Sequence, residues 1–206
     1  MIDHFAQLDE PRRPWIDPEA LKTKFLALSA EVHPDRVHGA SDDQKLAANG
    51  RYAELNNAYN CLRDTKERLR HLLELEQGVK PNEIERVPPG TMDLFFEVGK
   101  VCREVDSFLD EKSKVTSPIL KVRLFERGME WTDRLNVLLQ GIGRQYDALL
   151  AEIQMLNEDW NSEPVPGTTA RPEARTLERL EQVYRDLSFL GRWRAQIRDR
   201  IVQLSF

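Results

Sequence analysis

The chain has 206 residues, of which 40% are hydrophobic and 32% charged, and its formal net charge is −5. This length suits one domain or two small ones, and the negative charge argues against general binding to nucleic-acid phosphate. The first five residues lack the basic and apolar regions of a signal peptide, and no apolar run approaches the ~20 residues that span a bilayer. Cys61 and Cys102 lie far apart, which suits a reducing compartment. We therefore expect a cytoplasmic protein that binds neither nucleic acid nor membrane.

Helical periodicity dominates the chain, and period-2 strand patterns are absent. The first third predicts two antiparallel helices with a short helix at each end. The first long helix is expected to end near Val32, because Pro34 disfavours helical backbone at the residue before it. Side chains that accept hydrogen bonds from the first turn are expected to cap the successive helices, namely Asp17, then Asp42 or Asp43, then Asp64.

A second helical region follows a proline-bearing segment without periodicity. Apolar stripes run over residues 94–108, 135–156 and 177–204, with spacings of three and four. Helices with such stripes pack as an antiparallel bundle. The sequence thus predicts an all-α fold with an N-terminal domain over 1–76, a linker over 77–90 and a C-terminal three-helix bundle over 91–206.

The most informative local motif is His33-Pro34-Asp35, which lies in a predicted loop between two amphipathic helices. In this setting the sequence resembles a J domain, the module by which DnaJ-type co-chaperones engage a DnaK-type chaperone ATPase. The resemblance covers about residues 2–76. It is carried further by Ala58-Tyr59, by Leu62 and by Lys66-Glu67-Arg68.

The resemblance implies that this loop docks on the partner ATPase and shifts its conformational equilibrium towards hydrolysis. The residues that it assigns to contact with the chaperone are His33, Pro34 and Asp35, with Lys22, Lys24 and Arg36 supplying positive charge for steering. The helix before the loop also carries acidic residues, so docking is expected to be weak or tuned to one partner. The alternative is that the tripeptide merely ends a helix and makes a turn.

The layout beyond the J domain resembles the HscB-type co-chaperones of iron–sulfur cluster assembly, whose C-terminal bundle holds an IscU-type scaffold. The chain has neither a Gly/Phe-rich linker nor cysteine-rich zinc repeats. Similarity is clearest over residues 94–97, 103–106 and 157–160 and around Phe189. The resemblance implies an apolar scaffold-binding patch at Phe95, Phe96 and Phe189.

The helical periodicity supports part of this assignment. Phe96 falls off the buried stripe of its helix, and Phe189 lies beside the seam of the last helix. Exposed phenylalanines on a small bundle indicate a protein-docking patch. The alternative is that Phe95 and Phe96 only widen the core stripe.

No metal or cofactor is expected. His33 and His38, with Asp35 or His71, make a weak ligand set without a Cys-x-x-Cys or His-Glu-x-x-His pattern. We expect His4 and His71 to be isolated and Cys61 to pack beside Leu62.

The leading functional hypothesis is a co-chaperone that binds an IscU-type scaffold, presents it to a DnaK- or HscA-type ATPase and triggers hydrolysis there. It is not expected to be an enzyme itself. One alternative keeps the J domain but gives the bundle a different client or a role in self-association. Another is an enzyme with His33 and Asp35 as acid and base, although no nucleophile or cofactor motif accompanies them.

Overall fold

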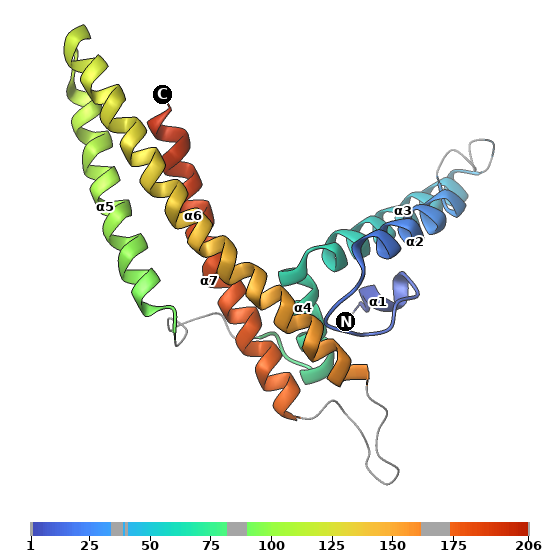
Figure 1. Ribbon diagram of the computed structural model, residues 1–206. Helices are drawn as coiled ribbons and strands as arrows, with labels where there is room; N and C mark the ends of the chain where they lie inside the picture. The colour runs from blue at the N-terminus through green and yellow to red at the C-terminus, as the bar shows by residue number, and fades with distance from the viewer. Residues whose placement is uncertain (1, 34–38, 40, 82–89, 162–173, 206) are drawn as a thin grey trace. The chain divides into compact units, whose positions relative to one another are not determined.

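The computed structural model describes residues 2–33, 39, 41–81, 90–161 and 174–205. Within these ranges the regular structure is helical, without a strand, which confirms the all-α fold (Figure 1). The helices are α1 His4–Gln7, α2 Pro18–Glu31, α3 Asp42–Arg63, α4 Thr65–Gln77, α5 Met92–Lys114, α6 Pro118–Asn161 and α7 Ala174–Leu204. In this described part, the helices are all too short or too polar for a membrane span.

The chain divides into two compact units, and α6 and α7 each contribute to both. Unit 1 contains Met1–Asn82 and Glu152–Tyr184, and unit 2 contains Glu83–Ala151 and Arg185–Phe206. The end of α6 and the start of α7 therefore group with the N-terminal helices. The domain boundaries expected from sequence stay a prediction, and most of the expected linker, 82–89, lies outside the described residues.

Side-chain caps define where the helices of unit 1 begin. Asp17 accepts a hydrogen bond from the Ala20 N–H at 2.7 Å, and Asp64 accepts one from the Glu67 N–H at 2.9 Å, as predicted. The predicted cap of α3 is wrong, because Ser41 caps this helix in place of Asp42 or Asp43. The Ser41 hydroxyl accepts from the Gln44 N–H, and the Gln44 side chain accepts from the Ser41 N–H. The two aspartates lie instead in the first turn, where their negative charges interact favourably with the positive end of the helix dipole.

In unit 1, α3 packs against α1, α2 and α4. A buried guanidinium reinforces this packing: Arg68 of α4 donates to the carbonyl oxygens of Pro14, at 2.9 Å, and Leu62, at 2.6 Å. It thereby satisfies carbonyls that burial would otherwise leave without a donor. The buried apolar residues of these N-terminal elements are Phe5, Leu8, Ile16, Leu21, Ala58, Leu62, Leu69, Leu72 and Leu73.

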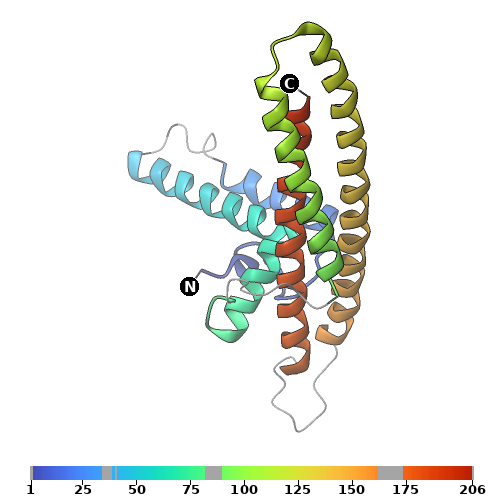
Figure 2. The same ribbon diagram turned by 90° about the vertical axis from the view of Figure 1, so that its left-hand side faces the viewer.

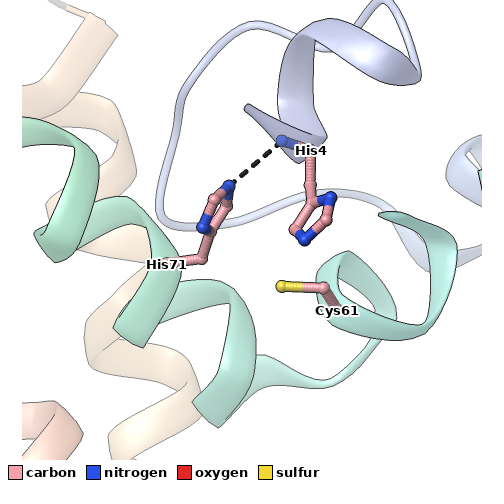
Figure 3. A group of neighbouring side chains, drawn as sticks. All are labelled: His4, Cys61 and His71. Carbon is pink, nitrogen blue, oxygen red and sulfur yellow. Dashed lines mark hydrogen bonds between the residues drawn. The ribbon is translucent and has the colours of Figure 1, made fainter. Parts of the chain in front are cut away.

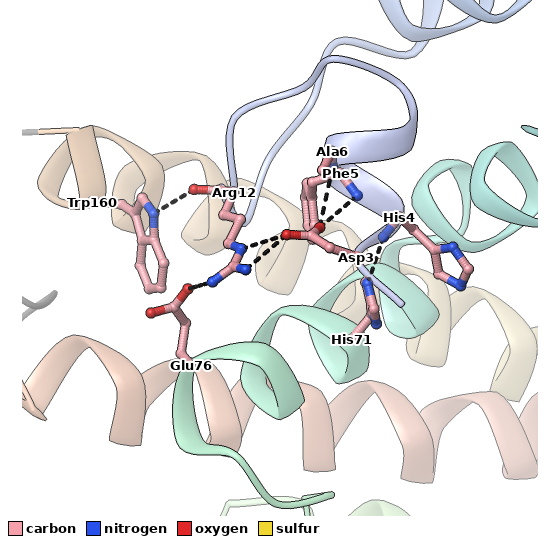
Figure 4. Close-up of polar contacts among 8 residues, drawn as sticks. All are labelled: Asp3, His4, Phe5, Ala6, Arg12, His71, Glu76 and Trp160. Atoms are coloured by element: carbon pink, nitrogen blue, oxygen red, sulfur yellow. Dashed lines mark hydrogen bonds and ion pairs between the residues drawn. The ribbon is translucent and has the colours of Figure 1, made fainter. Parts of the chain in front are cut away.

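Arg12 ties the N-terminal segment to the rest of unit 1 (Figure 4). Its guanidinium pairs with Asp3 at 2.8 Å and with Glu76 of α4 at 3.4 Å, and its carbonyl oxygen accepts from Trp160 Nε1 at 2.7 Å. Burial raises the pKa of Asp3, but hydrogen bonds from Arg12 and from the Ala6 and Phe5 amides outweigh it. They hold the pKa of this carboxyl below its usual value.

Unit 2 is built by α5 and the adjoining parts of α6 and α7, which lie side by side in Figures 1 and 2. Two ion pairs show how α5 and α6 run relative to each other: Arg134 of α6 pairs with Glu104 of α5, and Arg127 of α6 pairs with Glu111 of α5. The helices are therefore antiparallel, as the predicted three-helix bundle requires. Their core contains Val98, Val101, Cys102, Val105, Phe108, Leu124, Leu135, Leu138, Ile142, Phe189, Leu190, Trp193, Ile197 and Leu204.

Candidate functional site

The first candidate site follows the end of α2. Val32 caps this helix, and the half-buried His33 comes next. The His33 ring meets the ring of Tyr52 on α3 edge to face, with 5.4 Å between their centroids. The other predicted loop residues, Pro34, Asp35 and Arg36, lie outside the described residues. His33 is thus held against α3 at the point where the chain leaves α2.

An open depression of about 310 Å³ lies beside His33, between the end of α2 and the first turns of α3. Sequence reasoning missed its cation, Arg51, and the ring partner Tyr52. Both lie within α3, and only the antiparallel packing of α2 and α3 brings them next to His33. Such a surface suits docking of an acidic or mixed protein surface better than enclosure of a small substrate. The depression is lined by Glu31, Val32, His33, Gln44, Ala47, Ala48 and Arg51.

The two lysines predicted to steer the partner differ in their surroundings. The Lys24 ammonium pairs with the buried Glu10 at 2.6 Å and donates to the Asp9 carbonyl oxygen at 3.0 Å. The Lys22 side chain is 55% exposed, and its ammonium pairs with the exposed Glu19 at 3.7 Å. Lys22 therefore presents its charge to solvent, whereas the Lys24 ammonium is held within unit 1 by Glu10, which it shares with Arg13.

The second candidate site is an aromatic cluster in unit 2, formed by Phe95 and Phe96 of α5 and by Phe189 and Trp193 of α7. The ring centroids are 5.6 Å apart for Phe95 and Phe96, 6.1 Å for Phe95 and Trp193, and 5.8 Å for Phe189 and Trp193. The sequence predicted the three phenylalanines but missed Trp193, which connects them. Its i+4 spacing from Phe189 is the only signal that could have indicated it.

The aromatic cluster has an exposed part and a buried part. Phe96 is 62% exposed and Phe95 37%, so the alternative that both only widen the core is wrong. The expectation that Phe189 is exposed is also wrong, because only 9% of it is accessible. Its ring packs against Trp193, and the Arg192 guanidinium lies 4.6 Å from the ring centroid. The buried rings therefore support two phenylalanines that project from α5, an arrangement suited to docking an apolar protein surface.

The expectation that His4 and His71 are isolated is wrong as well. Cys61 of α3 lies with both of them, and the three groups bring their ligand atoms within 4.8 Å of one another. Burial raises the pKa of the Cys61 thiol to about 11. Burial also lowers the pKa of His71, and the neighbouring His4 adds to this effect, so the neutral imidazole is favoured. Among the described residues, His4, Cys61 and His71 are therefore close enough together to act as metal ligands.

Curated relatives of this chain are co-chaperone protein HscB homologues. The Bordetella petrii protein is 42% identical over 72 residues, which cover 35% of this chain and 42% of the relative. The Paraburkholderia phymatum protein is 39% identical over the same length, which covers 41% of the relative. The Vibrio cholerae protein is 27% identical over 128 residues, or 61% of this chain and 74% of the relative. The match thus spans about two fifths of the first two relatives.

Solved structures extend the likeness over nearly the whole chain. The chaperone HscB from Vibrio cholerae has a TM-score of 0.57 at 19% identity, with 98% of this chain and 99% of that chain covered. The chain therefore has the HscB fold. Human co-chaperone HscB has a TM-score of 0.58 at 15% identity, covering 96% of this chain and 81% of that one. The scan against protein-family models found no match. The HscB fold agrees with the J domain and helical bundle predicted from sequence.

Proposed function

We propose that this chain is a cytoplasmic co-chaperone that stimulates the ATPase of a DnaK- or HscA-type chaperone and delivers an IscU-type scaffold to it. In this role it regulates a partner's hydrolysis and catalyses no reaction itself. The observation that carries the proposal is the HscB fold over 98% of the chain, combined with His33-Pro34-Asp35 directly after α2. The named relatives are co-chaperones and support the same role.

The proposed chaperone-binding residues are His33, Pro34, Asp35, Arg36, Lys22 and Lys24. The contact of His33 with Tyr52 supports the proposal, because it holds the His33 ring against α3 before a partner binds. The solvent-facing charge of Lys22 supports a steering role. Docking acts by binding the hydrolysis-competent state of the chaperone better than its other states.

His33→Gln should lower stimulation of the chaperone ATPase at saturating co-chaperone by about tenfold, within the usual range of coupling between sites. The measurement is steady-state ATP hydrolysis by the chaperone, with thermal unfolding of the variant as a check on folding. Unchanged stimulation by a folded His33→Gln variant contradicts the chaperone arm of the proposal. A reaction of the isolated protein that this variant abolishes would favour an acid–base enzyme instead.

Two lysine-to-alanine variants, at Lys22 and Lys66, test whether Lys22 steers the chaperone electrostatically. Lys22→Ala should slow association with the chaperone and weaken its salt dependence, because an exposed charge acts on the encounter rate. Lys66→Ala is the matched control, since Lys66 is a partly exposed lysine on α4 in the same unit. Stopped-flow association at two salt concentrations distinguishes the two variants. If both variants slowed association equally, the association rate would depend on the net charge of the protein and not on the position of Lys22.

The proposed client-binding residues are Phe95, Phe96 and Phe189, and the proposal assigns them unequal roles. Phe96 and Phe95 are exposed enough to contact a client, whereas Phe189 supports them from within the core. Two exposed rings above a buried aromatic base have the anatomy of a binding hot spot, in which a few rigid aromatic anchors carry most of the energy.

Calorimetric titration with the IscU-type scaffold tests the client arm. Phe96→Ala should weaken binding by at least about tenfold, which is the loss of one hot-spot contact. Val137→Ala is the control, because Val137 is an apolar residue of α6 that is 65% exposed, close to the 62% of Phe96, and lies outside the aromatic cluster. Phe189→Ala is a poor test, because loss of a buried ring also destabilises the bundle. Normal binding by Phe96→Ala contradicts the assigned client site.

An exposed apolar row on α6 favours a second candidate role for the bundle, in another client or in self-association. Its members, Ile119, Val122, Phe125 and Met129, follow a spacing of three and four and are all more than half exposed. Sedimentation over a range of protein concentrations tests self-association. A concentration-dependent dimer that Phe125→Ala abolishes, together with absent scaffold binding, would favour this role.

A further inference from the structure

Three potential metal ligands converge in unit 1 from distant parts of the sequence (Figure 3). His4 opens α1, Cys61 lies near the end of α3, and His71 lies within α4. Their ligand atoms all lie within 4.8 Å of one another. Among the described residues, this is the group of three side chains that could hold a metal ion. Figure 3 shows one ring nitrogen of His4 turned towards the Cys61 sulfur.

The separation of these atoms, at most 4.8 Å, can be compared with that of the ligands around a bound metal. Zinc takes bonds of about 2.0–2.1 Å to imidazole nitrogen and about 2.3 Å to thiolate sulfur in tetrahedral geometry, so its ligands lie roughly 3.5 Å apart. A contraction of at most about 1.3 Å from the 4.8 Å limit, within reach of small side-chain rotations, would bring the three groups to this spacing. Two imidazoles and a thiolate prefer zinc and related transition metals over calcium or magnesium.

Gln7 orients the His4 ring so that one of its nitrogens could bind a metal. The Nδ1 atom of His4 lies 2.9 Å from the Gln7 Oε1 atom, and an amide oxygen only accepts hydrogen bonds. Nδ1 therefore carries the proton, and the lone pair lies on Nε2. Metal-binding histidines are oriented in this way, by a hydrogen bond from the nitrogen that does not bind the metal.

His71 has a partner that a metal must replace. Its Nε2 accepts a hydrogen bond from the His4 backbone N–H at 3.1 Å, and its ring stacks on Phe5 with centroids 5.8 Å apart. An imidazole nitrogen has a single lone pair, so a metal bound at Nε2 displaces the amide. The Cys61 thiol donates to the Glu67 carbonyl oxygen at 3.7 Å and must also give up this contact.

We propose that His4, Cys61 and His71 form a mononuclear site for zinc or a similar transition-metal ion, with a fourth position open to water. On binding, Cys61 transfers its proton to solvent and the sulfur forms its bond to the metal as a thiolate. The metal would join α1, α3 and α4 and so stabilise unit 1. This inference does not depend on the proposed co-chaperone function.

Cobalt titration of the metal-free full chain tests the site, because a thiolate bound to Co²⁺ gives a charge-transfer band in the near ultraviolet. We expect a band that saturates at one equivalent and that Zn²⁺ removes by competition. Cys61→Ser should abolish the band. Cys102→Ser is the matched control and should retain it, because Cys102 is buried in the core of unit 2. A missing band, or one that survives in Cys61→Ser, overturns the proposal.

The histidines are tested separately, so that misfolding is not mistaken for loss of a ligand. His4→Gln should weaken Co²⁺ binding at least about tenfold, since even the loss of an outer-shell partner costs 10–100-fold. His4 is only half-buried, so this variant should fold even if a change at the buried His71 does not. Zn²⁺ at a hundredfold excess over its dissociation constant should raise the Tm of the parent chain by at least about 5 °C and leave that of Cys61→Ser unchanged. Equal shifts in both overturn the site.

Discussion

Unit 1 and unit 2 hold their helices together in different ways. In unit 1, polar side chains reach across from one element to another, as Arg68 does to Pro14 and Arg12 to Asp3. In unit 2, long apolar stripes on α5, α6 and α7 make the core, and the ion pairs lie on the outside. Both units have a buried apolar core, but in unit 1 buried polar side chains add hydrogen bonds between elements, whereas the core of unit 2 is almost wholly apolar.

The two candidate sites reflect the same contrast. The surface at His33 combines a ring pair with the nearby cation Arg51, whereas the surface at Phe96 is aromatic. Charged surfaces chiefly set association rate and specificity, and buried aromatic anchors chiefly set the dissociation rate. A co-chaperone that meets an ATPase briefly and holds a client longer would require such a division.

The largest loss of stability is expected when a substitution creates a cavity in the core of unit 2. Leu135→Ala should lower the free energy of unfolding of this unit by about 3–4 kcal/mol, because Leu135 is fully buried and the surrounding helices cannot fill the space. Val137→Ala is the control, since Val137 is 65% exposed on the same helix and should change stability by less than about 0.5 kcal/mol. Denaturant unfolding followed by amide hydrogen exchange in α5 measures both. Similar losses for the two variants would contradict a packed core.

Arg68→Met should lower the stability of unit 1 by about 2–3 kcal/mol. Methionine replaces the stem of the side chain but leaves the Pro14 and Leu62 carbonyl oxygens without their donor. Hydrogen exchange should be faster in α4 and unchanged in α5. Arg63→Met, at an exposed arginine of α3, should have little effect. A stable Arg68→Met variant would show that unit 1 is held by apolar packing after all.

A helix cap should have a smaller effect. Asp64→Ala removes the acceptor of the Glu67 N–H at the start of α4 and should cost about 1 kcal/mol. Asp42→Ala is the matched change inside the first turn of α3, where Ser41 is the cap, and should cost only about 0.3 kcal/mol through the helix dipole. Urea unfolding compares the two. The reverse order would mean that Ser41 does not cap α3.

The smallest effect is expected at an ion pair of unit 2. Asp106→Asn weakens the two hydrogen bonds that the Arg200 guanidinium makes to this carboxylate, at 2.7 and 2.8 Å. Because the Asp106 side chain is 51% exposed, the loss should be about 0.5 kcal/mol and should shrink at high salt. Unfolding at low and high ionic strength measures it. A loss larger than that of Arg68→Met would reverse the contrast between the units.

Local patterns were enough to predict the helical elements. Asp17 and Asp64 were recognisable as caps because a cap acts on amides two or three residues away. The apolar stripes predicted the bundle because helical periodicity identifies a buried face without knowledge of its partner. The exposure of Phe96 was predicted in the same way. The cap of α3 was missed because Ser41, Asp42 and Asp43 are all good acceptors, and only backbone geometry decides among them.

The sequence by itself therefore determined the all-α class, the helices and the end of α2 at Val32, because these depend on interactions between near neighbours. Only the tertiary structure decided that Phe189 is buried under Arg192 and that Trp193 connects the aromatic cluster. It also decided that His4, Cys61 and His71 meet. Each of these depends on which face of one helix meets another, and such contacts between distant residues leave no periodic signal in the sequence.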